Sequence, residues 1–324
     1  MKFVVWKAYH LESRSIVDEY VRLILPALSE QEVVVCESDD DAAREIADAD
    51  VMIGWRITPP VFASAKRLRW VQFGSAGLNH TMFPELESND VVLTTLSGVH
   101  TTVVAEHVIA QMLALARRLD TALRLASHHS YDRSEIASEA SVLRGKTLLI
   151  VGLGKIGSSV AQLAKAFGMR VVGTKRTLPA NIVGVDGVFP PDKLRDLLPD
   201  ADFVALLAPL TQETNALIGR SELALMKRNA YLINVARGAM VDHDALAEAL
   251  RSNRLAGAAL DVFPTEPLEP DSPVYGLPNT IITPHTAASF AEYAPLGAEI
   301  VRRNVAAFLS GGEMVNVYDR GRGY

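Results

Sequence analysis

The sequence has 324 residues, of which 49% are hydrophobic and 22% charged, which is enough material for about two globular domains. The formal net charge of -6 argues against a nucleic-acid partner, because proteins that bind phosphate backbones usually carry a basic face. Cys36 is the single cysteine, so an intrachain disulfide and a cysteine-rich metal site are excluded. No signal-peptide pattern and no apolar run of about 20 residues is present, and we therefore expect a cytoplasmic protein without a membrane partner or a metal.

The first third of the chain alternates between apolar runs and helical patterns. Strands are predicted at residues 2–6, 32–36, 51–55, 69–73 and 91–95, and helices at 18–28, 41–49 and 61–68. This alternation predicts a parallel sheet covered by helices. Small residues at 74–77 follow the fourth strand, and ligands of such sheets tend to bind beyond the carboxyl ends of strands. This turn is a candidate for substrate contact, although a merely tight loop explains its spacing equally well.

A longer helix is predicted in the middle of the chain. After Ser97 and Gly98, which we interpret as a linker, apolar residues recur at helical spacing from residue 101 to residue 127. We expect this helix to bridge two domains. Residues 128–144 are polar and irregular, and they lead into the second half of the chain.

A glycine-rich unit opens the second half. The unbroken apolar run at 147–151 is typical of a strand buried on both faces, and a second strand is predicted at 170–174. Between them stand three glycines with the G-x-G-x-x-G spacing, namely Gly152, Gly154 and Gly157, followed by a helical pattern. The first glycine permits the tight turn, the second lets the backbone approach a pyrophosphate, and the third lets helix pack on strand. We predict dinucleotide binding here; the alternative is that the glycines serve only the turn.

The same alternation continues to the end of the chain. Further strands are predicted at 202–207, 231–235, 256–260 and 280–283, and helices at 192–198, 221–226, 242–251 and 289–309. With the two strands of the glycine-rich unit they make six parallel strands, which is what a complete dinucleotide domain needs. We expect the last helix to return to the first domain.

The residues after the second strand of the glycine-rich unit bear on the choice of cofactor. NAD-specific units usually place an acid about 20 residues after the first glycine, where it binds the ribose 2′-hydroxyl. No acid stands in this segment, which reads Gly173, Thr174, Lys175, Arg176 and Thr177. A carboxylate would repel a 2′-phosphate, whereas these cations and hydroxyls could hold it. We predict that NADP(H) is preferred and NAD(H) possible; the alternative is a solvated basic turn with mixed cofactor use.

Several linked motifs resemble the D-isomer-specific 2-hydroxyacid dehydrogenase family, in particular its glyoxylate and hydroxypyruvate reductases. They are GLGKIG (152–157), LLAPLTQETNALI (206–218), INVARGAMVDHDAL (233–246), AGAALDVFPTEPL (256–268) and TPHTAAS (283–289), with a looser match in WVQFGSAGLNH (70–80). The resemblance covers essentially the full chain. It implies an α/β fold with two Rossmann-like, doubly wound parallel-sheet domains. A cofactor domain at 99–287 would be inserted into a substrate domain formed by 1–98 and completed by 288–324.

The resemblance also implies roles for individual residues. Arg237 would hold the carboxylate and carbonyl of a 2-oxo acid, His285 would donate the proton, and Glu266 would pair with His285. Main-chain N–H groups of Ala76 and Gly77 would bind the substrate carboxylate. Asn79 stands where many relatives carry aspartate, which leaves the fine structure of this loop open. Besides the three glycines, the cofactor would contact Lys155, Ile156, Thr174, Lys175, Arg176, Thr177, Pro209, Thr214, Val235, Ala236, Asp261 and His285.

Elementary chemistry supports the same three catalytic residues. Adding hydride to a carbonyl leaves negative charge on oxygen, and histidine, with an unperturbed pKa of about 6.5, can supply a proton near neutral pH. A neighbouring carboxylate would hold the ring in one orientation, and the planar fork of arginine matches a carboxylate. Each residue also has a structural alternative: a surface histidine, a solvated proline-rich loop around Glu266, or a turn capped by Arg237. Arg56 is a weaker pocket candidate, and His100, His107, His128 and His129 are expected to be structural or surface residues.

These observations favour an NADPH-dependent reductase of glyoxylate, hydroxypyruvate or a similar 2-oxo acid, in which two domains close and exclude water. Reduction should need protonated His285, so reduction and oxidation should prefer lower and higher pH respectively. One alternative is a family enzyme acting on phosphoglycerate, formate or phosphite. The other is a corepressor-like binding protein that senses the cofactor. By resemblance we expect a homodimer built on the helix at 101–127.

Overall fold

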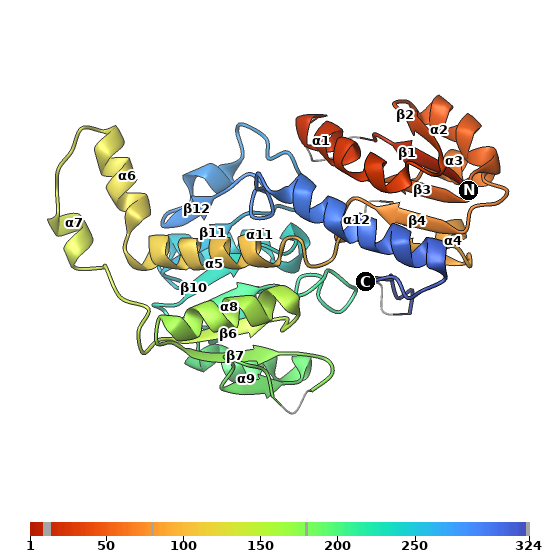
Figure 1. Cartoon of the computed structure of the whole chain (residues 1–324). Coiled ribbons are helices and arrows are strands. Elements are labelled where there is room, and N and C mark those ends of the chain that lie inside the picture. Colours follow the sequence, from red (N-terminus) through yellow and green to blue (C-terminus); the bar gives the residue numbers. More distant parts are fainter. Residues whose placement is uncertain (9–13, 79–80, 179–180, 322–324) are drawn as a thin grey trace. The chain divides into compact units, whose positions relative to one another are not determined.

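The computed structural model describes residues 1–8, 14–78, 81–178 and 181–321. The chain divides into two compact units: unit 1 is Met1–His100 with Phe290–Tyr324, and unit 2 is Thr101–Ser289. Each unit contains one sheet of parallel strands with interleaved helices (Figure 1), so the predicted α/β fold with two doubly wound sheets is confirmed. Among the described residues, no helix is long and apolar enough to cross a membrane.

In the described part of unit 1, five parallel strands pair in the order β2-β1-β3-β4-β5. The strands are β1 (Lys2–Trp6), β2 (Glu32–Cys36), β3 (Val51–Gly54), β4 (Trp70–Phe73) and β5 (Val92–Thr94). The helices are α1 (Arg14–Ile24), α2 (Asp39–Glu45), α3 (Pro59–Ser64), α4 (Pro84–Glu87) and α12 (Tyr293–Ser310). This strand order is one of the two common doubly wound orders, and β1 and β3 lie at its switch point.

Both faces of the unit 1 sheet are buried, which explains its unbroken apolar strands. One face packs against α1 and α12, whose apolar residues join those of the sheet in one cluster that includes Val17, Ile24, Ala298 and Val301. The other face packs against α2 and α3 through a second cluster. The last helix of the chain therefore belongs to the unit that the first residues form.

A buried polar network links α12 to the middle of this sheet. The side chains of Gln72, Thr94 and Asn304 are all fully buried. Asn304 donates from Nδ2 to Oε1 of Gln72 at 2.9 Å and to the carbonyl of Val315 at 3.1 Å, and its Oδ1 accepts from the Val315 N–H at 2.8 Å. Gln72 Oε1 also accepts from the Thr94 hydroxyl at 2.8 Å. Because the three side chains are fully buried and Val315 is half-buried, removal of one member leaves polar groups of the others unpaired.

In the described part of unit 2, seven parallel strands pair in the order β12-β11-β10-β9-β6-β7-β8. The strands are β6 (Thr147–Val151), β7 (Arg170–Thr174), β8 (Gly187–Phe189), β9 (Phe203–Leu206), β10 (Tyr231–Asn234), β11 (Gly257–Leu260) and β12 (Thr280–Ile282). Read from β8, this is the Rossmann order 3-2-1-4-5-6 with one further strand, and the direction of winding reverses between β6 and β9. The prediction of six strands missed β8, because that strand has three residues, begins with glycine and is only half-buried.

The helices of unit 2 are α5 (Thr101–Ala116), α6 (Leu119–Ser127), α7 (Ser134–Ala137), α8 (Lys155–Ala166), α9 (Leu194–Leu197), α10 (Arg220–Leu225) and α11 (His243–Arg251). The single helix expected at 101–127 is wrong, because it is broken between α5 and α6. Arg118 has φ +56° at the break, and its buried guanidinium donates to Asn279 Oδ1 at 2.7 Å and to Thr121 Oγ1 at 2.9 Å. Periodicity could not show the break, because Asn279 lies far away in sequence. Figure 1 shows α6 and α7 projecting from the end of α5, away from the unit 2 sheet.

We expect Asn304→Ala to lower the free energy of unfolding of unit 1 by about 1–3 kcal/mol, because the buried Gln72 Oε1 and the half-buried backbone groups of Val315 lose their partner. Urea unfolding followed by tryptophan fluorescence measures this change. Arg303→Ala, an exposed substitution on the same helix, is the matched control and should stay within about 0.5 kcal/mol of the wild type. Equal stabilities of the two variants would contradict the role of the network.

Candidate functional site

The glycine-rich turn between β6 and α8 shows three separate reasons for its glycines. Gly152 has φ +105°, and a Cβ there would lie 2.5 Å from the backbone nitrogen of Ala208. At Gly157 a Cβ would lie 2.4 Å from the carbonyl oxygen of Gly152, so this glycine lets α8 approach the turn closely. At Gly154 a Cβ would meet nothing within 4 Å. The turn is thus closed on the sheet side and open at Gly154, which leaves room for a ligand at the N-terminus of α8.

The N-terminus of α8 offers backbone donors to that open space. Gly154 is the N-cap and contributes no side-chain hydrogen bond. Among the described residues, none accepts a hydrogen bond from the N–H of Ile156 or Gly157. Such N–H groups and the positive end of the helix dipole favour a phosphate. Lys155, also at the helix start, is exposed. The residues present therefore fit the pyrophosphate of a dinucleotide.

Behind the turn, Lys175 stabilises its shape. Its ammonium donates to the carbonyl oxygen of Leu153 at 2.7 Å, and its backbone N–H donates to Phe189 at 2.9 Å. Thr174 is buried, whereas Arg176 and Thr177 are exposed. Of the four residues predicted to hold a 2′-phosphate, Arg176 and Thr177 are thus the accessible pair, and Lys175 is engaged with the turn.

Two further segments predicted to contact the cofactor follow β9 and β10. After β9, the hydroxyl of Thr214 donates to the carbonyl of Pro209 at 2.7 Å and accepts from the N–H of Thr211 at 2.7 Å, which closes that loop on itself. After β10, Val235 is half-buried and Ala236 is buried. Their neighbour Asn234, which sequence reasoning missed, is fully buried.

Asn234 and His243 shape the turn that presents Arg237. Asn234 donates from Nδ2 to the carbonyl of Arg237 at 2.9 Å and accepts from the N–H of Ala236 at 3.1 Å. Burial lowers the pKa of His243, whose Nε2 lies 3.3 Å from the carbonyl of Gly238, so a neutral ring can donate there. Position 238 of this turn requires glycine, because a Cβ there would lie 2.0 Å from the backbone carbonyl carbon of Phe263.

Solvent reaches part of the Arg237 side chain, and its Nη1 donates to the carbonyl of Ala236 at 2.7 Å. Desolvation lowers the pKa of the Arg237 guanidinium, and the negative charge of Glu266 acts in the opposite direction. An arginine remains charged under such influences, so the site keeps a cation suited to a carboxylate.

Glu266 connects the loop after β11 with the loop after β12. Its Oε1 accepts from the N–H of Phe263 at 2.8 Å, and its Oε2 lies 2.6 Å from Nδ1 of His285. Both side chains are about 30% exposed, so the pair is fixed but reachable from solvent. The predicted pairing of an acid with this histidine is thus present in the geometry, 19 residues apart in sequence. The roles of the three residues remain predictions.

Asp261, predicted as a cofactor contact, lies beneath the histidine loop and is 1% exposed. Its carboxylate accepts from the Thr283 hydroxyl at 2.5 Å and from the N–H groups of Thr286 and Ala287 at 2.9 and 3.0 Å. Its carbonyl accepts from the N–H of His285 at 2.9 Å. These bonds hold His285 at φ +52°, a left-handed conformation that a side chain other than glycine rarely adopts.

His107, which was expected to be structural or on the surface, supports this loop from α5. Its Nε2 lies 3.4 Å from Thr283 Oγ1 and 2.9 Å from Gln111 Nε2. Burial lowers the pKa of His107, and the charge of Asp261 opposes this effect. Sequence reasoning had no signal for this contact, because residues 107 and 283 are 176 positions apart.

In unit 1, the loop at 74–77 follows β4 as predicted. Ala76 and Gly77 lie in it, and no described residue accepts from their N–H groups. Asn79 lies outside the described residues. Arg56 forms an ion pair with Asp39 at 2.8 Å, and its guanidinium lies 5.4 Å from the centre of the Trp6 ring. These two contacts already partly compensate its positive charge. His128 is exposed on unit 2, and His100 stacks on Tyr293 in unit 1.

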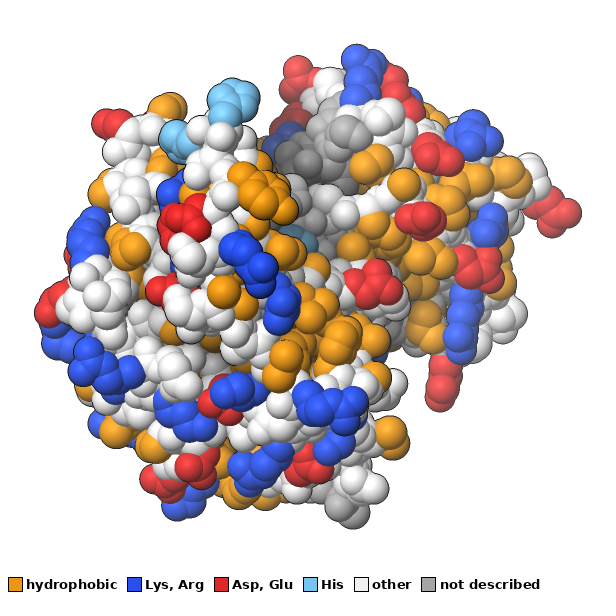
Figure 2. All heavy atoms as spheres, turned by 90° about the vertical axis from the view of Figure 1, so that its left-hand side faces the viewer, with side chains coloured by type: hydrophobic (Ala, Val, Ile, Leu, Met, Phe, Trp, Pro, Cys, Tyr) orange, Lys and Arg blue, Asp and Glu red, His pale blue; other side chains and the backbone are white. Residues whose placement is uncertain are grey.

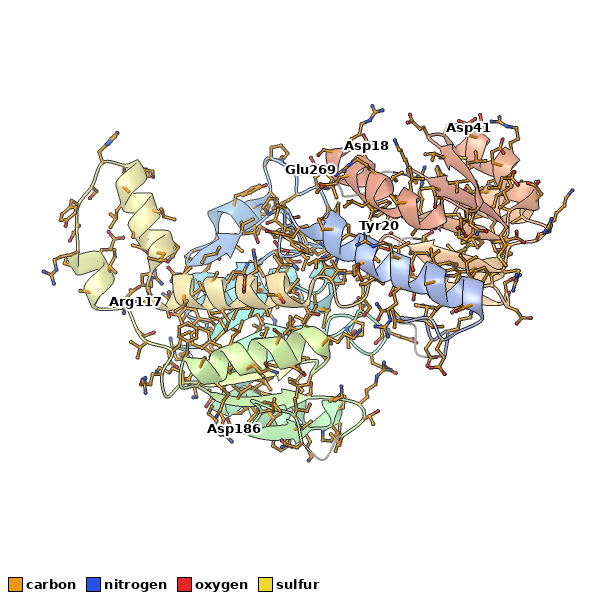
Figure 3. All side chains as sticks on the ribbon, in the orientation of Figure 1. Asp18, Tyr20, Asp41, Arg117, Asp186 and Glu269 are labelled. Carbon is orange, nitrogen blue, oxygen red and sulfur yellow. The ribbon has the colours of Figure 1, made fainter. Side chains whose placement is uncertain are left out.

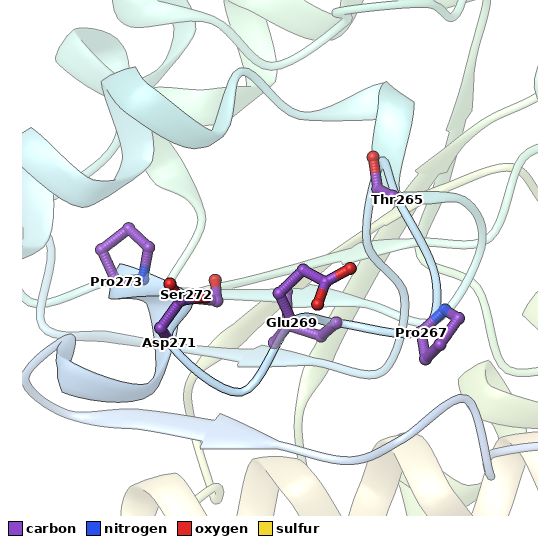
Figure 4. A pocket seen from close by; sticks show the side chains of 7 residues that line it. Thr265, Pro267, Glu269, Asp271, Ser272 and Pro273 are labelled. Carbon is purple, nitrogen blue, oxygen red and sulfur yellow. The ribbon is translucent and has the colours of Figure 1, made fainter.

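A separate pocket lies beside the Glu266 loop of unit 2 (Figure 4). It is lined by Thr265, Pro267, Leu268, Glu269, Asp271, Ser272 and Pro273. This lining carries two carboxylates and no basic side chain, which makes it unsuitable for an anionic 2-oxo acid. The edge that carries Arg237 and His285 is therefore the better candidate site.

Comparison with known proteins agrees with this geometry. Residues 109–287 match the family domain described as "D-isomer specific 2-hydroxyacid dehydrogenase, NAD binding domain". A glyoxylate reductase of Korarchaeum cryptofilum is 36% identical over 279 residues, which is 83% of this chain and 82% of that protein. A D-3-phosphoglycerate dehydrogenase of Methanocaldococcus jannaschii is 34% identical over 91% of this chain, but the match spans only 56% of that longer relative.

The structure is also similar to a solved NADPH-dependent glyoxylate/hydroxypyruvate reductase of Sinorhizobium meliloti in complex with NADP and sulfate. The TM-score is 0.84 at 27% identity, and both chains are covered completely. The matching domain lies within unit 2 and includes the glycine-rich turn, Arg237, Glu266 and His285. The chain therefore belongs to the D-isomer-specific 2-hydroxyacid dehydrogenase family, whose members are NAD(P)-dependent oxidoreductases.

Proposed function

We propose that this protein reduces a small 2-oxo acid, such as glyoxylate or hydroxypyruvate, to the D-2-hydroxy acid with NADPH. The observation that carries the proposal is the pair formed by His285 and Glu266 at 2.6 Å, presented at the same sheet edge as Arg237. The similarity to glyoxylate reductases supports this substrate class. Unit 2 would supply the catalytic side chains, and the N–H groups of Ala76 and Gly77 in unit 1 would bind the substrate carboxylate.

His285 is the proposed proton donor. An ionised carboxylate can only accept hydrogen bonds, so Nδ1 of His285 donates to Glu266 and Nε2 is left for the substrate. A nicotinamide cofactor held at the glycine-rich turn and the N-terminus of α8 would supply the hydride for the keto carbon, and negative charge would develop on the carbonyl oxygen. Protonated His285 then gives its Nε2 proton to that oxygen, and Glu266 stabilises the ring orientation throughout. Reduction consumes a proton and oxidation releases one, so lower pH should favour reduction and higher pH oxidation.

Arg237 is proposed to bind the substrate carboxylate and polarise the carbonyl. Its guanidinium keeps its charge and offers two parallel donors, which suit a 2-oxo acid in one orientation. The rigid turn formed by Asn234 and Gly238 limits the positions that this side chain can reach. Orientation of this kind matters because the reacting atoms must lie close together before transfer.

We expect His285→Ala to lower kcat for glyoxylate reduction by about 10²- to 10⁴-fold, the usual contribution of a general acid. NADPH oxidation at 340 nm measures the rate, and cofactor fluorescence measures binding, which should be retained. Glu266→Gln keeps the size of the side chain and should give a smaller loss. His128→Ala removes an exposed histidine of the same unit and is the matched control. An unchanged rate in His285→Ala would end the proton-donor role.

NADPH is the proposed cofactor because residues 174–178 contain no acid and expose Arg176 and Thr177. We expect kcat/KM to be higher with NADPH than with NADH. Arg176→Ala should lower kcat/KM with NADPH by about 10-fold and leave NADH almost unchanged, because only the 2′-phosphate gains from the guanidinium. Initial rates with both cofactors measure the ratio. A preference of the wild type for NADH would reject this assignment.

A homodimer is proposed through the projecting α6 and α7. Four large apolar residues of this region are exposed: Leu119, Leu123, Tyr131 and Val142. Figure 2 views the molecule from the side on which α6 and α7 project, and hydrophobic side chains stand among charged ones there. Leu119 and Leu123 belong to the segment 101–127 on which the resemblance predicts a homodimer, and a second copy packed there would cover them.

Leu123 is 70% exposed, so its replacement should not disturb the unit 2 core. We expect Leu123→Asp to shift the protein from dimer to monomer in light scattering coupled to size exclusion. Leu309→Asp, an exposed leucine on α12, is the control and should leave the dimer intact. A monomeric wild type, or a dimer that survives Leu123→Asp, would contradict this interface.

A further inference from the structure

Three carbonyl groups of the loop at 74–77, those of Gly74, Ser75 and Gly77, are anchored within unit 1. The Tyr293 hydroxyl donates to the carbonyl of Gly74. The next carbonyl, that of Ser75, accepts from the N–H of Leu96 at 2.9 Å. The hydroxyl of Ser75 donates to the carbonyl of Gly77 at 3.1 Å. Hydrogen bonds to these carbonyl oxygens thus hold the loop in place.

Anchoring the acceptors sets the direction of the donors. A peptide unit is planar, and its C=O and N–H point to opposite sides. Fixing the carbonyl of Gly74 therefore orients the N–H of Ser75, and fixing the carbonyl of Ser75 orients the N–H of Ala76. The backbone at Gly74 also packs closely on Trp55, since a Cβ there would lie 2.6 Å from the ring of that residue. The anchored carbonyl of Ser75 thus orients the Ala76 donor directly, and the Gly77 donor is confined between the anchored carbonyls of Ser75 and Gly77. The anchor at Gly74 fixes the start of the loop from which both donors follow.

We propose that Tyr293 is a positioning residue for substrate binding: its hydroxyl holds the loop so that the N–H groups of Ala76 and Gly77 converge on the substrate carboxylate. This inference rests on the proposed function. Tyr293 contacts no reacting atom in this scheme and acts through the loop. Its own position is fixed, because the ring stacks on His100 with centroids 5.2 Å apart and meets Phe290 edge-on at 6.1 Å.

The ring and the hydroxyl of Tyr293 have separable roles. The ring is 3% exposed and belongs to the apolar cluster between α12, α1 and the sheet, so it contributes to stability by burial. The hydroxyl contributes one directed hydrogen bond to the loop. Tyr293→Phe removes the hydrogen bond of the hydroxyl and keeps the buried ring. Tyr20 on α1, labelled in Figure 3, offers a matched control, because its buried hydroxyl has no partner among the described residues.

The kinetic test compares Tyr293→Phe and Tyr20→Phe with the wild type. We expect Tyr293→Phe to raise KM for glyoxylate by about 3- to 10-fold, the range of one hydrogen bond, with KM for NADPH unchanged. The dissociation constant of oxamate, a carboxylate that is not reduced, should rise by the same factor. Tyr20→Phe should change none of these values. Equal KM and oxamate affinity in Tyr293→Phe and the wild type would overturn the proposal.

A second measurement needs no substrate and keeps the two proposals apart. The N–H of Leu96 reports on the loop, since its acceptor is the carbonyl of Ser75. We expect hydrogen–deuterium exchange at Leu96 to become faster in Tyr293→Phe than in Tyr20→Phe, while the strands β1 and β3 stay protected. Unchanged exchange at Leu96 would refute the positioning role even in an active enzyme. Faster exchange in a protein that turns over no 2-oxo acid would refute only the proposed function.

Discussion

The carboxylate of Glu266 is the constraint on which the site depends. One oxygen accepts from the backbone of Phe263, and the other holds the ring of His285. A single acid thereby joins the loop after β11 to the loop after β12. The adjacent strand β10 ends in the turn of Arg237, whose glycine packs directly on the backbone of Phe263. The parallel sheet brings these loops to one edge, and Glu266 fixes their final geometry.

This geometry is maintained by groups that need never touch a substrate. The left-handed backbone of His285 costs about 1 kcal/mol or more, and persists only where surrounding bonds over-determine it. Asp261 provides such bonds to Thr283, Thr286 and Ala287, at full burial. Tyr293 has a comparable place in unit 1, behind the loop that we assign to the carboxylate. In each unit a buried polar side chain, Asp261 or Tyr293, holds the backbone of a loop that we assign to substrate binding or catalysis. Neither side chain contacts a reacting atom in the proposed scheme.

The sequence alone was sufficient to predict those strands whose residues form a clear local pattern. The strands at 2–6, 32–36, 147–151 and 170–174 have the predicted bounds, because they are apolar runs in parallel sheets, even though the one at 32–36 is a partly exposed edge strand. The fold class and the family followed from motif order. The break at Arg118 and the contact of His107 with Thr283 could not be predicted, since each is set by a partner more than 150 residues away. Asn234 was missed because a single buried asparagine at the end of a strand carries no local pattern of its own.

The central claim is that His285, positioned by Glu266, meets the carbonyl oxygen of a 2-oxo acid. A crystal structure with NADP and oxamate tests it most directly. We expect Nε2 of His285 within about 3.2 Å of the oxygen that corresponds to the carbonyl, with Nδ1 still on Glu266 and the ligand carboxylate on Arg237. An oxamate bound with that oxygen turned away from His285, or bound in the acidic pocket beside Glu269, would contradict it.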